Sequence, residues 1–183
     1  MAVDRIAIII DASSLYHASR TLGMDVDFVN IKSSFSRSGR IIRAEYHVVV
    51  PPDDAYSSLR PLLDWLTYNG FTVVEKRGRY RESDGQRNVY GDASIAIAVS
   101  AYSIAQLCDH LILFVSNGDL RAAIAAVQRK GVRVTVVSTA ITRPPMVADA
   151  LRRQANQFLE LGDLASLLCR TPRRGASRVL PAT

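Results

Sequence analysis

Two unbroken apolar runs dominate the pattern of hydrophobic and polar positions along the chain. Residues 6–10 and 112–115 contain no polar side chain, which is typical of strands buried on both faces. Each run ends in a polar turn, at Asp11 and at residues 116–119, and helical spacing follows both turns. Because parallel strands present their ligand sites beyond their carboxyl ends, we expect the function to lie at these two turns.

The rest of the chain alternates predicted strands with predicted helices. Further strands are predicted at residues 41–50, 71–74, 132–137 and 158–159, and helices at 14–23, 28–35, 56–68, 92–107, 120–131 and 144–154. The helix at 92–107 is apolar on nearly all sides, so we expect it to be central and buried. Between the strands at 71–74 and 112–115, a basic stretch from Lys76 is expected to form a loop or ribbon.

This rhythm predicts βαβ units. We therefore expect a single three-layer α/β domain over residues 1–168, with a mostly parallel sheet of five or six strands and helices on both faces. Residues 169–183 are rich in arginine and are expected to form a basic, disordered tail.

Composition narrows the class of protein. The 183 residues are 48% hydrophobic and 22% charged, and no apolar run approaches the ~18 residues of a membrane span. We therefore expect a cytoplasmic protein without a membrane partner. The two cysteines predict neither a disulfide framework nor a metal site. The three histidines, His17, His47 and His110, lack the mutual spacing of a zinc site or a catalytic triad.

The positive charge is concentrated in two places. The formal net charge is +6, yet residues 76–87 hold five basic and two acidic side chains, and residues 170–183 hold four arginines and no acid. A basic strip and tail on a nearly neutral body suit a polyanion partner, although solvated loops that aid solubility explain them equally well. Tyr80 and Tyr90 flank the strip, where aromatic rings can stack on unpaired bases.

Asp11 and Asp119 each follow a buried strand, so both are expected at the same edge of the sheet. Two converging carboxylates suit a divalent cation such as Mg²⁺, which could activate water for phosphodiester hydrolysis. Alternatively, each aspartate caps the helix that follows it. The residues alone leave both interpretations open.

Four segments carry a resemblance to a known family. Residues 8–16, 60–71, 131–139 and 144–149 resemble the NYN domain, a PIN-like nuclease fold that includes the LabA-like bacterial proteins, and the likeness extends over about residues 4–165. The resemblance implies a PIN-like fold, RNA as a partner, and Mg²⁺- or Mn²⁺-dependent endoribonuclease chemistry by acidic residues at the carboxyl edge of the sheet.

When the family's acidic positions are matched residue by residue to this sequence, few of them hold an acidic residue. Asp11 keeps the family's first aspartate and Asp119 the last acid of the later turn, and Asp92 lies close enough in sequence to compensate for a lost one. The positions at which the family's asparagine or acidic residue is replaced are Ser14, Ser94, Ala96, Ser100, Asn117 and Asn156. Since clustered carboxylates repel each other without a cation, joint loss of them indicates a site that has lost its metal.

Three functions therefore stay open. The first is an RNA-associated protein of ribonuclease ancestry with weak or lost hydrolysis, and with Mg²⁺, Mn²⁺ or no cofactor. Its phosphate contacts would be Arg77, Arg79, Arg81, Arg87, Arg152 and Arg153. The second is an active Mg²⁺- or Mn²⁺-dependent endoribonuclease that uses Asp11, Asp119 and Asp92. The third is a non-catalytic interaction module that binds a protein partner or a second copy of itself.

Overall fold

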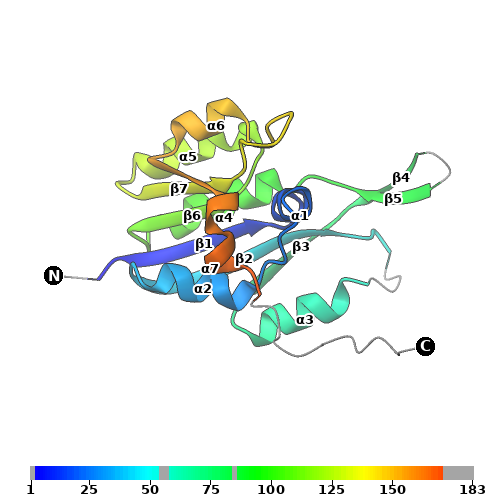
Figure 1. Ribbon diagram of the computed structural model, residues 1–183, viewed down its shortest axis with the longest axis horizontal. Helices are drawn as coiled ribbons and strands as arrows, with labels where there is room; N and C mark the ends of the chain where they lie inside the picture. Colours follow the sequence, from blue (N-terminus) through cyan, green and yellow to red (C-terminus); the bar gives the residue numbers. More distant parts are fainter. Residues whose placement is uncertain (1–2, 54–57, 84–85, 171–183) are drawn as a thin grey trace, which may run out of the picture.

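Six parallel strands form the central sheet of the computed structural model, which describes residues 3–53, 58–83 and 86–170 (Figure 1). The strand order is β3-β2-β1-β6-β7-β8. These strands are β1 (Arg5–Asp11), β2 (Arg40–Val50), β3 (Thr72–Arg77), β6 (His110–Phe114), β7 (Arg133–Ser138) and β8 (Gln157–Glu160). Every neighbouring pair is parallel, which confirms the predicted fold class.

Helices cover both faces of the sheet. This is expected because successive side chains of a strand point to opposite faces, and the apolar runs place hydrophobic residues on both. Ile6, Ile8 and Ile10 of β1 pack in the core on one face, and Ala7 and Ile9 pack in the core on the other. The first face is covered by α1 (Ala12–Thr21), α2 (Phe28–Ser36), α3 (Arg60–Tyr68) and α7 (Ala165–Leu168), and the second by α4 (Ser94–Ile104), α5 (Arg121–Gln128) and α6 (Asp149–Gln154). Two short 3-10 helices are η1 (Gly118–Leu120) and η2 (Leu161–Leu164).

The order of the strands reverses between β1 and β6. The chain leaves β1 through α1 and α2 on one face to reach β2, whereas it leaves β6 through η1 and α5 on the opposite face to reach β7. The connections on the two sides of β1 and β6 therefore diverge at their carboxyl ends. Such a switch point opens a crevice where ligands of open α/β sheets bind.

Helix α4 is not the buried central helix that its composition predicted. Ile97, Ala101 and Ile104 pack into the core, but Ile95 and Val99 expose 77% and 62% of their surfaces. The helix packs on one face of the sheet, so only the side that meets the sheet is buried. Because α4 has apolar residues on every side, its sequence does not indicate which side that is.

Other boundaries differ in smaller ways. The helix predicted from residue 144 begins at Asp149, because residues 141–147 form bends over the edge of the sheet. The beginning of the helix predicted at 56–68, and residues 171–183 of the predicted tail, lie outside the described residues. Within the described ranges, no helix has the length and apolarity needed to cross a membrane.

The basic stretch folds as a ribbon, one of the two forms expected. Strands β4 (Arg79–Ser83) and β5 (Gln86–Tyr90) pair in an antiparallel hairpin that projects from the body (Figure 1). Gly78 and Gly91 stand at the base of this hairpin, on either side of its two strands, and both press against Val49 of β2. A Cβ atom built on Gly78 would lie 2.7 Å from Val49 Cγ1 and 2.8 Å from the carbonyl oxygen of Tyr90.

The substitution Gly78→Ala is therefore expected to destabilise the protein by about 1–3 kcal/mol, since overpacking against backbone forces the hairpin to shift. Urea unfolding followed by circular dichroism measures this loss. Gly162→Ala is the matched control, because its added Cβ would meet its nearest neighbour, Ile141 Cδ1, at an ordinary 3.6 Å. Equal midpoints for the two variants would show that the glycine contact at the hairpin base is unimportant.

Candidate functional site

A cleft of about 500 Å³ opens at the switch point, beyond the carboxyl ends of β1 and β6. Its polar lining comes from the turns after both strands and from the beginnings of α1 and α4; the hairpin adds Tyr90 and Gly91 at its rim. The full lining is Asp11, Ser13, Ser14, His17, Val49, Tyr90, Gly91, Asp92, Ala93, Ser94, Ser116, Asn117, Pro144, Pro145 and Met146.

Asp11 ends β1 and caps α1, as expected if this aspartate serves as a helix cap and not as a cation ligand. Its Oδ2 atom accepts hydrogen bonds from the backbone N–H of Ser14 at 3.2 Å and from Ser14 Oγ at 2.5 Å. Ser14 Oγ in turn accepts from the backbone N–H of Ser116 at 3.1 Å. The carboxylate of Asp11 is thus tied through one hydroxyl to the end of β6, which fixes the width of the cleft at its floor.

Asn117 joins the opposite wall of the cleft. Its Nδ2 atom donates to Ser94 Oγ at 2.9 Å, and its Oδ1 atom accepts from the backbone N–H of Asp119 at 3.0 Å. Asn117 is therefore the cap of η1, a place that the sequence had assigned to Asp119. An asparagine can donate and accept at once, whereas a carboxylate in this place could only accept.

Asp92 lies at the beginning of α4, and its Oδ1 atom accepts from the backbone N–H of Ser94 at 2.8 Å. Hydrogen bonds from the side chain and backbone of Ser94 hold the pKa of Asp92 below its ordinary value. The ammonium of Lys76 adds to this effect, and it also donates to the carbonyl oxygen of Asp92. Asp92 is thus charged at neutral pH and binds the backbone N–H of the first residue of α4, although the N-cap position itself is Ala93.

The structure gathers some of the predicted site residues and separates others. Asp11, Asp92, Ser14, Ser94 and Asn117 line the cleft. Asp119 is exposed on η1 and is not part of that lining.

Asn156 stands at the opposite edge of the sheet, before the amino end of β8. Its Oδ1 atom accepts from the backbone N–H of Val134 at 2.8 Å and from Gln128 Nε2 at 3.0 Å. These bonds fasten β7 and α5 to the beginning of β8. The structure therefore gives Asn156 a structural part to play, away from the cleft.

Ala96 and Ser100 lie further along α4 and are not in the cleft lining. Ser100 instead hydrogen-bonds to the buried carboxylate of Glu45, whose Oε2 atom lies 3.0 Å from His47 Nε2. Burial opposes the charge of Glu45, but the hydrogen bonds from His47 and Ser100 outweigh this effect and hold its pKa below the ordinary value. Glu45 and His47 thus form a buried polar pair on β2 beneath α4. His47 precedes Val49, a cleft residue, by two positions along the same strand.

These donors do not match the multi-carboxylate centre that the family resemblance implies. The cleft offers two carboxylates, and each already accepts a hydrogen bond from a helix N–H group. Among residues 3–53, 58–83 and 86–170, no three histidine, cysteine, aspartate or glutamate side chains come together as a metal site would require. The other polar groups of the lining are mostly hydroxyls, which are weaker ligands for Mg²⁺ or Mn²⁺ than carboxylates.

His17 also lines the cleft, although its spacing from the other histidines predicted neither a zinc site nor a catalytic triad. It follows Ser14 by three positions in α1, so the two lie on the same face of the helix, which Asp11 caps. That spacing is the signal that could have found it.

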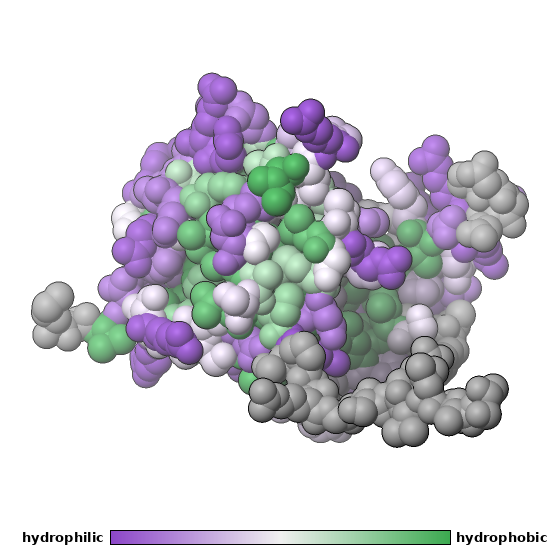
Figure 2. Space-filling model, in the orientation of Figure 1, coloured by the Kyte–Doolittle hydropathy of each residue, from purple (hydrophilic) through white to green (hydrophobic). Residues whose placement is uncertain are grey.

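The hairpin beside the cleft carries arginines that lie over aromatic rings. The guanidinium carbon of Arg87 lies 3.5 Å from the ring centroid of Tyr80, and that of Arg81 lies 5.7 Å from the centroid of Tyr90. Tyr90 exposes 62% of its surface and also lines the cleft. Figure 2 shows hydrophilic side chains gathered over this hairpin and over α6.

The other predicted phosphate contacts differ in their surroundings. Arg77 Nη1 donates to the carbonyl oxygen of Pro52 at 2.8 Å. On α6, Arg152 and Arg153 both pair with Asp149, at 3.3 Å and 2.7 Å. These exposed ion pairs are weak, but they partly neutralise the charge of α6, so the hairpin is the more strongly basic of the two surfaces.

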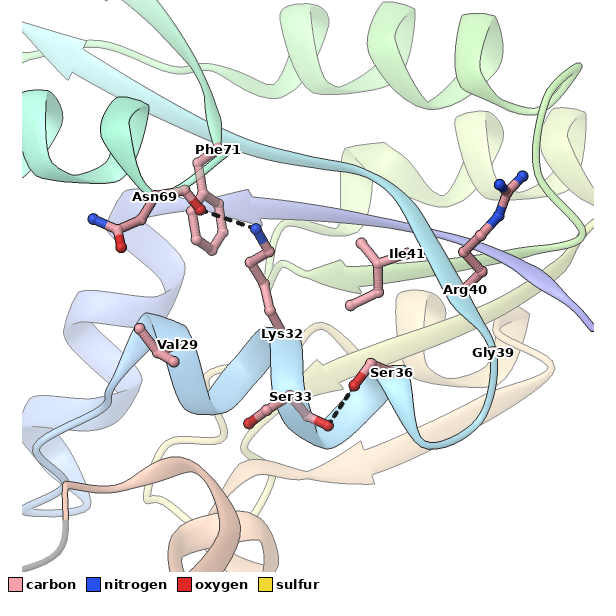
Figure 3. Close-up of a pocket in the computed structure, with 9 residues that line it drawn as sticks. All are labelled: Val29, Lys32, Ser33, Ser36, Gly39, Arg40, Ile41, Asn69 and Phe71. Carbon is pink, nitrogen blue, oxygen red and sulfur yellow. Dashed lines mark hydrogen bonds between the residues drawn. The ribbon is translucent and has the colours of Figure 1, made fainter.

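A second hollow, of about 570 Å³, lies between α2 and the amino ends of β2 and β3 (Figure 3). Its ammonium group belongs to Lys32, which donates to the carbonyl oxygen of Asn69 at 2.9 Å and lies 5.2 Å from the ring centroid of Phe71. Lys32 therefore closes the end of α3. This hollow is at the sheet edge opposite the switch point and shares none of the cleft's residues.

Comparison with known proteins decides the family. The model of the NYN domain family matches residues 5–164 of this chain. The chain belongs to the NYN domain family.

The relatives of this NYN domain agree with that assignment. The chain is 27% identical over 175 residues to the low amplitude and bright protein LabA of Synechococcus elongatus, a match that covers 92% of this chain and 90% of that protein. A solved structure of a protein of unknown function from Vibrio parahaemolyticus superposes with a TM-score of 0.70 at 22% identity, and covers 87% of this chain and 93% of that one. The structural likeness confirms the fold, which is PIN-like.

Proposed function

We propose that this NYN domain is an RNA-binding protein of ribonuclease ancestry in which hydrolysis is weak or lost. The observation that carries the proposal is the position of Tyr90, which belongs both to the basic hairpin and to the wall of the switch-point cleft. An RNA strand on the hairpin would therefore lead directly into the cleft.

Each part of this surface suits single-stranded RNA. Arginines supply charge to the phosphates, which accounts for most sequence-independent affinity. Tyr90 offers an exposed ring on which a base can stack, and a positively charged groove with stacking rings is the usual way of holding an unpaired strand. The hydroxyls and amide of the cleft add donors and acceptors for the sugar and base edges.

The same cleft argues against strong hydrolysis. A phosphodiesterase that activates water with metal ions relies on carboxylates that hold the ions in place. Here Ser94 and Asn117 occupy positions where the family resemblance implies acids, and they hydrogen-bond to each other instead. That bond gives both side chains a partner within the protein and removes the need for a cation.

One observation favours the alternative of an active ribonuclease. Asp11 and Asp92 line the same cleft, one from each wall. Mg²⁺ can be held by one or two carboxylates together with substrate phosphates, so the two aspartates are the residues on which activity would depend.

Thermal melting with and without a divalent cation separates the two functions. A ligand that binds only the folded state raises its stability by mass action. We expect millimolar Mg²⁺ or Mn²⁺ to leave the melting temperature within about 1 °C of its value in EDTA. The variant Asp11→Asn should behave in the same way, since asparagine is also a good helix cap.

A rise of several degrees with Mn²⁺ that disappears in Asp11→Asn would contradict the proposal and restore the cleft as a metal site. Asp119→Asn is the matched control, because Asp119 lies outside the cleft lining. It should leave any cation effect unchanged.

A further inference from the structure

Helix α4 exposes an apolar stripe that the proposed RNA surface does not use. Ile95, Val99 and Tyr102 expose 77%, 62% and 49% of their surfaces. Their spacing of four and then three residues places them on one side of the helix. Soluble monomers rarely expose contiguous apolar patches beyond a few hundred Å², so this stripe needs an explanation.

The stripe contains no charge of its own. Helix α4, Ser94–Ile104, has no aspartate, glutamate, lysine or arginine. A charged group lies at each end instead. Asp92 precedes the first turn, with the Lys76 ammonium beside it. At the other end, Lys130 Nζ donates to the carbonyl oxygen of Tyr102 at 3.2 Å and lies 3.5 Å from its ring centroid.

We propose that this stripe is the interface between two copies of the chain, with their α4 helices antiparallel about a two-fold axis. A two-fold interface must be complementary to itself. In the antiparallel arrangement, the Asp92 end of each helix meets the Lys130 end of the other, so opposite charges lie at both ends of an uncharged centre. The helix dipoles are also opposed, which favours the same arrangement.

The spacing defines the register. If Ile95 of one copy packs against Tyr102 of the other, the axis passes between Ala98 and Val99. Val99 then lies beside Val99 of the second copy, at the centre where interface residues contribute most to binding. Ala98 is small and half-buried, which lets the two helices approach closely.

The wider charge distribution permits this association. The excess positive charge of the chain lies in residues 76–87 and 170–183, so the rest of the body is nearly neutral. A different protein partner would find no charge on the stripe by which to be recognised, whereas a second copy supplies its own aspartate and lysine. The three stripe residues lie outside the cleft lining, so the proposed dimer does not rest on the proposed RNA binding, although Asp92 borders both surfaces.

Sedimentation velocity of the full chain over a range of concentrations tests the proposal. We expect a reversible dimer that Val99→Arg converts to a monomer, because the substitution places two like charges beside the axis. Tyr68→Arg is the matched control. Tyr68 is 90% exposed on α3, on the other face of the sheet, and its substitution should leave the dimer intact.

Cysteine crosslinking tests the register. The test uses a Cys169→Ser background, because Cys169 is partly exposed whereas Cys108 is buried. Under diamide oxidation, Val99→Cys in this background should give a disulfide-linked dimer on a non-reducing gel, while Tyr68→Cys and the background itself should not. A wild type that sediments as a monomer at every concentration would overturn the proposal. So would a dimer that persists in Val99→Arg, or crosslinking that is as efficient at Tyr68→Cys as at Val99→Cys.

Discussion

Acidification from pH 6.5 to pH 4 is expected to remove about 3 kcal/mol from the free energy of unfolding through a single side chain, His110. Burial, with help from the Arg133 guanidinium, lowers the pKa of His110 to about 4. The geometry explains the shift. Arg133 Nη2, which can only donate, lies 3.1 Å from His110 Nδ1, so the neutral ring accepts at Nδ1 and donates from Nε2 to Thr135 Oγ1 at 2.7 Å.

The direction follows from where the proton binds. An unfolded chain protonates His110 near its ordinary pKa of about 6.5, while the folded chain does not until about pH 4. The stabilisation is therefore complete above pH 6.5 and is lost as the pH falls through this window. Urea unfolding at pH 7 and pH 5 should differ by about 2 kcal/mol on this account.

The variant His110→Gln isolates the effect, since glutamine does not titrate. Its stability should change little between pH 7 and pH 5, whatever its absolute value. His17→Gln is the control on an exposed histidine and should keep the slope of the wild type. An unchanged slope in His110→Gln would place the acid sensitivity elsewhere in the chain.

Reversing three charges on the hairpin is expected to lower the affinity for single-stranded RNA by at least about a hundredfold at low salt, because each lost phosphate contact also removes a released counterion. The variant carries Arg79→Glu, Arg81→Glu and Arg87→Glu. Fluorescence anisotropy of a labelled oligonucleotide, repeated at several salt concentrations, measures both the affinity and the slope of its logarithm against salt.

A charge-matched control separates position from net charge. Arg37→Glu, Arg40→Glu and Arg129→Glu lie on exposed residues at the opposite edge of the sheet. Each triple variant lowers the formal net charge from +6 to zero. Equal losses of affinity in the two variants would mean that RNA senses only the overall charge and not the hairpin.

The strands and the cap at Asp11 could be predicted from the sequence because local chemistry determines them. An apolar run such as residues 6–10 has few alternatives to a doubly buried strand, and an aspartate before helical spacing is a common cap. The PIN-like order of the strands came from the family resemblance, since apolar runs alone do not say which strands are neighbours.

The errors arose where a side chain's surroundings come from distant parts of the chain. The burial of α4 depended on which side met the sheet, and its uniform composition held no such information. Asp119 and Asn117 are two residues apart, and either could cap the helix that follows. The N-cap of the short helix η1 is Asn117. Asn156 was assigned to the site by its neighbours in sequence, yet the beginning of β8 lies at the far edge.

We propose that this NYN domain holds RNA at the hairpin and cleft with little or no cutting. The most direct test follows the anisotropy of an end-labelled single-stranded RNA over time after wild-type protein and Mn²⁺ are added. We expect a rise to a plateau that persists over the time of binding and that salt reverses. A rise followed by rapid decay to the value of short fragments would show efficient hydrolysis, and no rise at low salt would show that RNA is not the partner. Either result would contradict the proposed function.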